Sequence, residues 1–256
     1  MPTRIDNPKS LHGWTVLSLR PRGQHGGLRA AANRHGARVL ALSPFVIEPL
    51  TDAIHRKTLK QALAADIVVW TSPNAVRAAV ALQSLKARRG QAWLAVGSGT
   101  RRALLRAGID ARAPARMDSE GLLAMHELRE LHGRRIALVT APGGRGLLAP
   151  SLARRGAHVV RADVYARRPV AFNMRAIAAL DEVLAAQRHV LLALSSDEAL
   201  RRLLAARSAS AFAKIAVVAA SPRLAEVARQ AGFQRIAIAS SASPAALLHA
   251  AAGTFA

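Results

Sequence analysis

The chain has 256 residues, no cysteine and a formal net charge of +22 at pH 7. The lack of cysteine excludes disulfide bonds, thiolate metal ligands and cysteine nucleophiles, and it fits a reducing compartment, so we expect a cytoplasmic protein. A content of 51% hydrophobic and 20% charged residues is typical of a globular chain, and the length suits one large or two small domains.

The positive charge has two explanations. It would attract a polyanionic partner, either nucleic acid or a ligand with many carboxylates. Alternatively, GC-rich codons raise arginine and alanine together, and the basic residues here are nearly all arginine. Nucleic acid is disfavoured, because the arginines are spread over every segment and aromatic residues make up only 4% of the chain, too few for a base-stacking platform.

Neither end of the chain predicts a membrane segment. The first 14 residues contain no apolar run of the kind that signal peptides carry. The residues from Ile236 onward have no formal charge, but Pro244, His249 and the serine-rich run 240–243 make a poor membrane span. We expect a strand, a turn and a closing helix there.

Short apolar runs alternate with windows of helical apolar spacing along the whole chain. Several of the apolar runs are nearly continuous, which is typical of parallel strands buried on both faces. Alternation of this kind predicts right-handed βαβ units in doubly wound α/β sheets. The predicted strands are 15–19, 38–42, 66–71, 92–96, 135–139, 158–163, 189–194, 214–219 and 235–238.

The sequence contains two copies of this pattern. Residues 15–50 match residues 135–170 at an offset of 120, and residues 69–76 match residues 193–200 at an offset of 124. Two copies of one βα pattern predict two similar parallel-sheet domains. A cleft where two such domains face each other is where a ligand would bind.

Two extended segments interrupt the alternation, and they are repeat partners. Each ends in proline, at Pro49 and Pro169, which favours extended geometry in the residue before it. If the two segments pair, the chain crosses from one domain to the other and back. The expected arrangement is a discontinuous first domain over 1–42 and 170–256, a second domain over 50–160, and a two-stranded β-ladder over 43–49 and 161–169.

Polar turns follow the predicted strands where helices begin. Ser, Thr, Asp and Asn at such positions cap free backbone N–H groups, which is the simpler explanation for each residue alone. All of them nevertheless fall at the carboxyl ends of parallel strands, where open α/β sheets bind ligands and helix N-termini attract anions. The turns are 71–74 with its repeat partner 195–197, 97–100 with 221–223, and 118–121 with 243–244.

Other motifs give weaker signals. The run Gly97-x-Gly99 lacks the last glycine of a dinucleotide fingerprint, and the glycine-rich run 141–146 lacks the Lys-Ser/Thr of a phosphate loop. On a helix, His126 and Glu130 would share a face from which His132 points away, so we expect a solvated surface and no metal site.

Tyr165 is the only tyrosine and lies in the second extended segment. A phenol at that position can donate a proton or a hydrogen bond. The alternative is an aromatic ring that packs the hinge, like its repeat partner Phe45.

The order and spacing of these motifs resemble the uroporphyrinogen-III synthase family. The resemblance covers nearly the whole chain, although no single motif is specific. It implies two α/β domains joined by a two-stranded ladder, with the first domain discontinuous. The residues that carry it are Leu19-Arg20-Pro21, Thr71-Ser72-Pro73-Asn74-Ala75-Val76, Ala95-Val96-Gly97, Ser119-Glu120-Gly121-Leu122-Leu123, Val164-Tyr165 and Ser221-Pro222-Arg223-Leu224-Ala225.

The resemblance also implies a reaction. The substrate would be hydroxymethylbilane, a linear tetrapyrrole with eight carboxylates, which a lyase of this family cyclises with inversion of ring D and loss of water. No cofactor would take part, and we expect a cytoplasmic monomer that receives the bilane from hydroxymethylbilane synthase and binds neither nucleic acid nor membrane. The rival hypothesis is a non-catalytic two-lobed binding protein for a polyanionic small molecule.

Carried over residue by residue, the resemblance implies that Tyr165 assists the departing hydroxyl as a weak acid. Arg223 departs from the family, because many relatives carry Thr or Ser there, and its charge would replace a hydroxyl contact. The implied substrate-binding set is Arg20, Thr71, Ser72, Asn74, Gly97, Ser98, Thr100, Ser119, Glu120, Ser195, Ser196, Ser221 and Arg223.

Overall fold

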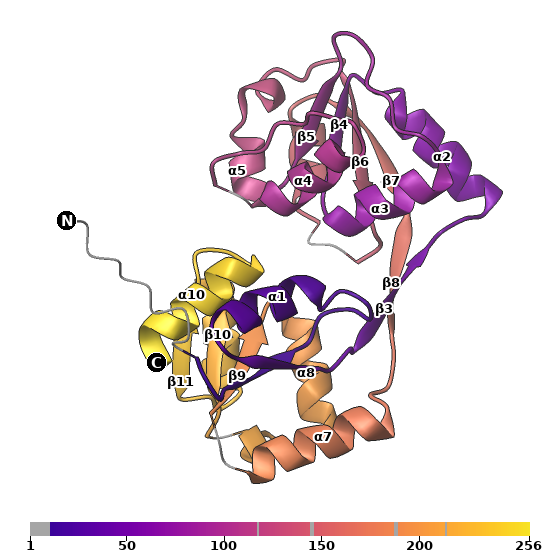
Figure 1. Cartoon of the computed structure of the whole chain (residues 1–256). Coiled ribbons are helices and arrows are strands. Elements are labelled where there is room, and N and C mark those ends of the chain that lie inside the picture. Colours follow the sequence, from indigo (N-terminus) through magenta and orange to yellow (C-terminus); the bar gives the residue numbers. More distant parts are fainter. Residues whose placement is uncertain (1–10, 117, 144–145, 187–188, 213) are drawn as a thin grey trace. The chain divides into compact units, whose positions relative to one another are not determined.

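The computed structural model describes residues 11–116, 118–143, 146–186, 189–212 and 214–256 (Figure 1). It divides into two compact units. The first contains the residues up to Val46 and those from Pro169 onward, and the second runs from Ile47 to Arg168. Each unit is a parallel sheet with helices on both faces, as the alternating apolar and amphipathic runs predict.

The sheet of the first unit has the strand order β11-β10-β9-β1-β2, with every pairing parallel. Alternate strand residues supply two cores. Val16, Leu191 and Val218 pack on the side of α1 and α10, whereas Leu17 and Leu192 belong to the core with α7, α8 and α9. The elements are β1 (Thr15–Ser18), α1 (Gly26–Arg34), β2 (Arg38–Ala41), α7 (Met174–Ala185), β9 (Val190–Leu194), α8 (Asp197–Ala206), a 3-10 turn (Ala209–Phe212), β10 (Ala216–Ala219), α9 (Pro222–Gln230), β11 (Arg235–Ile238) and α10 (Pro244–Phe255).

The sheet of the second unit has the order β5-β4-β6-β7, also all parallel. Val68 and Trp70 pack on the side of α2, α3 and α4, and Ile67 and Val69 pack on the side of α5 and α6. The elements are α2 (Ala53–Leu63), β4 (Ile67–Trp70), α3 (Pro73–Leu82), β5 (Ala92–Ala95), α4 (Ser98–Arg106), α5 (Ser119–Leu123), a 3-10 turn (His126–Leu128), β6 (Arg135–Thr140), α6 (Leu148–Arg154) and β7 (His158–Asp163).

The predicted duplication is confirmed, and the structure shows that the strand register repeats as well. Val16 pairs with Leu191 in the first unit, and their repeat partners Ile136 and Ile67 pair with each other in the second. The copies differ at one sheet edge. Where the first unit has β11, the described residues of the second unit form a single parallel bridge, between Leu94 and Arg112.

The two extended segments form their own two-stranded sheet, β3 (Phe45–Pro49) with β8 (Tyr165–Pro169). Backbone N–H groups donate from Leu50 to Val164 and from Val170 to Pro44, which is the pattern of an antiparallel pair. Within the described part of the chain, no helix combines the length and the apolar character needed to cross a bilayer.

Candidate functional site

The carboxyl ends of β4 and β6 in the second unit carry adjoining hydroxyl groups. Thr71 follows β4, and its Oγ1 donates to Oγ1 of Thr140, the last residue of β6, at 2.8 Å. The next residue, Ser72, is the N-cap of α3 and accepts the backbone N–H of Ala75 at 3.1 Å. Pro73 follows at the first helical position, where its missing N–H costs nothing.

Tyr165 joins this group through its phenol. Its oxygen lies 3.0 Å from Ser72 Oγ, and the ring packs in the core of the second unit with an exposed fraction of 5%. The repeat partner Phe45 is 2% exposed in the core of the first unit. Tyr165 therefore packs as Phe45 does, and in addition it directs a hydroxyl to the strand-end turn.

The N-termini of α3 and α4 lie side by side in the same unit. An added Cβ on Gly99 would be 3.5 Å from Pro73 Cγ, and α3 packs against α4. Gly97 is the N-cap of α4 and has no side chain to cap it, so the first-turn amides of Ser98 and Gly99 are available to an anion. Thr100 is 2% exposed, and we expect it to support this turn without contacting a ligand.

Asn74, on the first turn of α3, accepts from Arg77 Nη2 at 2.5 Å. This brings a guanidinium close to the α3 N-terminus. Thr71, Ser72, Asn74, Gly97, Ser98 and Tyr165 thus gather at one end of the second sheet, with hydroxyls, amides and a cation as the available groups.

The turn before α5 has two residues of capping type, Asp118 and Ser119. The N-cap is Asp118, which accepts the N–H of Gly121 at 2.7 Å, and Ser119 is already helical. The repeat alignment pairs Ser119 with the N-cap Ser243, so the two caps are one residue out of register. Glu120 is exposed and lies 3.8 Å from Arg116, an ion pair that offsets its charge.

The first unit repeats the arrangement of capped helices. Ser196 caps α8 and Ser221 caps α9, by accepting N–H groups at 3.3 and 3.4 Å. Ser195 is exposed at the end of β9. Arg223, at the start of α9, lies 4.0 Å from Asp197, at the start of α8. This ion pair offsets part of the positive charge that Arg223 would offer to a ligand.

Arg20 follows β1 and donates from Nη2 to the carbonyl of Ala242 at 2.9 Å. Burial lowers the pKa of Arg20 from its ordinary value, although a guanidinium stays charged at neutral pH. Ala242 directly precedes Ser243, the cap of α10, and an added Cβ on Gly27 of α1 would lie 3.4 Å from Pro244. Arg20 therefore lies beside the N-termini of two helices.

His25 is a residue that the sequence did not single out. It is 4% exposed, and its ring nitrogens Nδ1 and Nε2 lie 2.8 Å from the hydroxyls of Ser18 and Ser43. Its pKa is lowered by burial, then by the charges of Arg29 and Arg20. The partners are 7 and 18 residues away in the chain, so no local motif could have identified the cluster.

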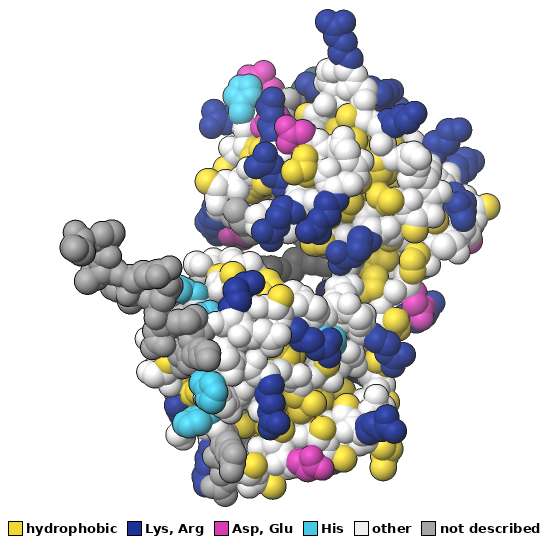
Figure 2. All heavy atoms as spheres, in the orientation of Figure 1, with side chains coloured by type: hydrophobic (Ala, Val, Ile, Leu, Met, Phe, Trp, Pro, Cys, Tyr) yellow, Lys and Arg dark blue, Asp and Glu magenta, His cyan; other side chains and the backbone are white. Residues whose placement is uncertain are grey.

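Basic side chains do not gather into a stripe on the face that Figure 2 shows; they are scattered over both units. This agrees with the dispersed arginines of the sequence. Among the described residues, no three His, Cys, Asp or Glu side chains converge as a metal site would require.

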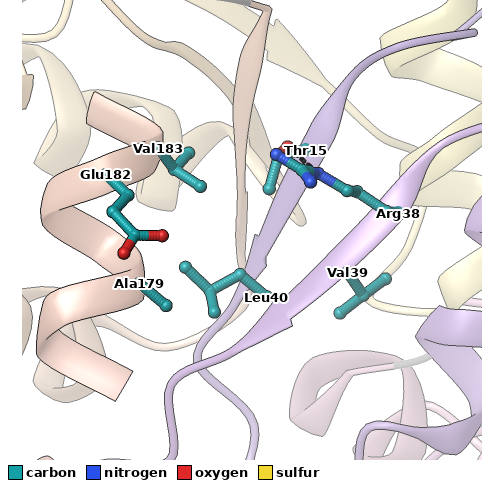
Figure 3. A pocket seen from close by; sticks show the side chains of 7 residues that line it. All are labelled: Thr15, Arg38, Val39, Leu40, Ala179, Glu182 and Val183. Carbon is teal, nitrogen blue, oxygen red and sulfur yellow. Dashed lines mark hydrogen bonds between the residues drawn. The ribbon is translucent and has the colours of Figure 1, made fainter. Parts of the chain in front are cut away.

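A cavity of about 280 Å³ lies elsewhere, where α7 faces β1 and β2 (Figure 3). Thr15 and Arg38 line it at the amino ends of their strands, opposite to the polar turns, and Glu182 lies across from them.

The chain matches the family model described as uroporphyrinogen-III synthase HemD over residues 27–249. It is 33% identical to the uroporphyrinogen-III synthase of Salmonella typhimurium over 198 residues, which cover 72% of this chain and 78% of the relative.

Two solved structures share the fold. A mutant uroporphyrinogen III synthase from Thermus thermophilus aligns with a TM-score of 0.59 at 19% identity, over 92% of this chain and 96% of that one. The uroporphyrinogen-III synthetase of Helicobacter pylori aligns with a TM-score of 0.62 at 12% identity, over 95% and 99% of the two chains.

Proposed function

The chain belongs to the uroporphyrinogen-III synthase family, and we propose on that basis that it is a lyase that cyclises hydroxymethylbilane to uroporphyrinogen III. Ring D is inverted and water is lost. The observation that carries the residue assignment is the contact between Ser72 and Tyr165, because it places a phenol, the chain's only one, at a turn lined with hydroxyls and free amides.

The first step is loss of the hydroxyl from the ring A hydroxymethyl group. The C–O bond breaks, the pyrrole nitrogen of ring A releases its proton, and an electrophilic azafulvene forms. Tyr165 protonates the departing hydroxide as a weak acid, and the proton from the nitrogen restores the phenol. Ser72 holds the phenol in place throughout, since its hydroxyl is 3.0 Å away.

The next steps need little acid–base chemistry. The substituted carbon of ring D attacks the azafulvene to give a spiro intermediate, which fragments and recloses with ring D turned over. Because the bilane also cyclises unaided to the uninverted type I isomer, the protein's main task is to hold one conformation. Positioning of this kind can contribute up to about 7–11 kcal/mol.

The protein can position the bilane by binding its eight carboxylates. In the second unit, the amides of Ser98 and Gly99 are suitable donors. The hydroxyls of Thr71 and Ser72 are bonded to Thr140 and Tyr165, so these two residues support the turn. In the first unit, Arg20 beside α10 supplies a cation. The other residues of the proposed set bind the bilane directly or support residues that do. They are Asn74, Gly97, Thr100, Ser119, Glu120, Ser195, Ser196, Ser221 and Arg223.

The bilane reaches this monomeric chain from hydroxymethylbilane synthase in the cytoplasm. Direct transfer from one enzyme to the other is favoured because the bilane cyclises unaided. Bilane that spends time free in solution is converted to the type I isomer. Diluting both enzymes at a fixed ratio should then lower the type III fraction less than free diffusion of the bilane predicts.

The decisive experiment couples the purified chain to hydroxymethylbilane synthase and analyses the oxidised products. We expect the type III isomer to replace type I as the chain is titrated in. A product that stays type I at every concentration would exclude the synthase activity and leave a binding protein.

A further inference from the structure

The buried His25 ties together three segments at the carboxyl end of the first sheet. Ser18 is the last residue of β1, His25 directly precedes α1, and Ser43 lies in the connection from β2 to β3. Both ring nitrogens are within 2.8 Å of a serine hydroxyl, so the imidazole is held at two points. Such a double contact fixes the position of the ring and of the chain that carries it.

The segment that His25 closes is the β1–α1 loop, and Arg20 lies on it. The loop is attached to its surroundings at two further places. Arg20 donates to the carbonyl of Ala242, and the N–H of Arg22 donates to the carbonyl of Phe45 at 2.9 Å. His25 anchors the far end of the same loop, directly at the start of α1.

The chemistry of the cluster favours a neutral ring. Ser18 is fully buried, so its hydroxyl needs a partner inside the protein. Arg20 and Arg29 are the charged groups that act on His25, and both oppose a further positive charge there. A neutral imidazole with one N–H and one lone pair satisfies both serines without adding to that charge.

His25 also leaves the start of α1 open. It occupies the N-cap position, yet its side chain makes no capping hydrogen bond, because both nitrogens are turned to Ser18 and Ser43. Its role in this loop is therefore to hold the backbone and not to cap the helix.

We propose that His25 is a positioning residue, which holds the β1–α1 loop so that Arg20 is placed to bind a carboxylate of the bilane. The inference rests on the proposed function. In this inference His25 does not contact the substrate. Removing its hydrogen bonds to Ser18 and Ser43 should weaken substrate binding only because Arg20 is then no longer held in place.

The test compares KM and kcat for H25Q, S43A, R20Q and the double variant H25Q/R20Q in the coupled assay. Exposed His158, at the amino end of β7, gives the matched control H158N. We expect H25Q to raise KM about 5- to 10-fold and S43A about 2- to 3-fold, as the loss of one or two hydrogen bonds would, with kcat within about twofold. H158N should match the wild type.

The double variant separates positioning from general damage. If His25 acts through Arg20, H25Q raises KM by less than about twofold in the R20Q background. Additive effects, or an unchanged KM in both H25Q and S43A, would overturn the inference. Far-UV circular dichroism and melting curves test whether each variant folds. If H25Q does not fold, S43A takes its place in the comparison with R20Q.

The proposed function can fail separately. A wild type that forms no type III isomer refutes the synthase assignment before any variant is compared. A working synthase in which R20Q keeps the wild-type KM refutes the binding role of Arg20, and the role of His25 with it.

Discussion

The hydroxyl of Ser72 lies 3.0 Å from the phenol oxygen of Tyr165, although 93 residues separate them in the chain. The same hydroxyl accepts the N–H of Ala75 and so caps α3. One side chain therefore fixes the start of a helix and the direction of the proposed acid. A serine hydroxyl has one proton and two lone pairs, which is enough for both contacts.

Replacing Tyr165 by Phe tests the acid. The ring should still pack, since Phe45 occupies the repeat position with similar burial, but the proton donor is lost. We expect kcat to fall by up to about 10²-fold, in the low range for general acid catalysis. Turnover equal to the wild type in the coupled assay would remove Tyr165 from the chemical step.

Replacing Ser72 by Ala removes a helix cap and the partner of Tyr165 together. Loss of an N-cap costs about 1 kcal/mol of unfolding free energy. Asn173 provides a cap-only control, because it caps α7 by accepting the N–H of Ala176 at 2.7 Å and lies outside the proposed site. We expect S72A and N173A to lose similar stability in urea unfolding, and only S72A to lose activity.

The lowered pKa of His25 predicts how stability depends on pH. Burial, Arg29 and Arg20 hold its folded pKa below the unfolded value of 6.5, so between these two values the unfolded chain binds more protons. The free energy of unfolding should therefore fall as pH drops from about 6.5 through the folded pKa.

The variant H25N isolates this contribution. His35 also has a lowered pKa, caused by burial, Arg34 and His249, and it remains in the variant. Denaturant unfolding gives the free energy of unfolding at each pH between about 7.5 and 5, where most carboxylates stay ionised. This free energy should change less with pH in H25N than in the wild type. Equal slopes would show that His25 takes up its proton alike in both states.

Gly121 and Gly253 form a contrasting pair. A Cβ at Gly121 would lie 1.8 Å from the carbonyl oxygen of Arg116, whereas one at Gly253 in α10 meets nothing within 4 Å. We expect G121A to destabilise the protein by about 1–3 kcal/mol through overpacking. G253A should be neutral or stabilising by up to about 1 kcal/mol, because alanine is the better helix former. Comparable urea midpoints for the two variants would contradict the close backbone approach at Gly121.

At the polar turns, helix capping could be predicted from the sequence, but exposure to a ligand could not. Serines before Pro73, Pro222 and Pro244 cap their helices as their positions indicate, because capping depends on residues three apart. The cap of α5 is Asp118 and not Ser119, although both residue types can cap a helix, so the sequence alone left the choice open. Thr100 has the right residue type for a ligand contact, but its burial removes it from the surface.

The duplicated α/β architecture could be predicted from the sequence, because apolar runs that recur at fixed offsets indicate two buried parallel sheets. The strand register could not, since a strand that is apolar on both faces can shift by one residue without exposing an apolar side chain; the structure shows that Val16 with Leu191 reappears as Ile136 with Ile67. The packed fold also brings together polar groups from distant segments: Ser72 with Tyr165, and His25 with Ser18 and Ser43. Local pattern encodes burial, which each residue contributes on its own, whereas a hydrogen bond between distant segments depends on side-chain positions that exist only after the sheets are packed.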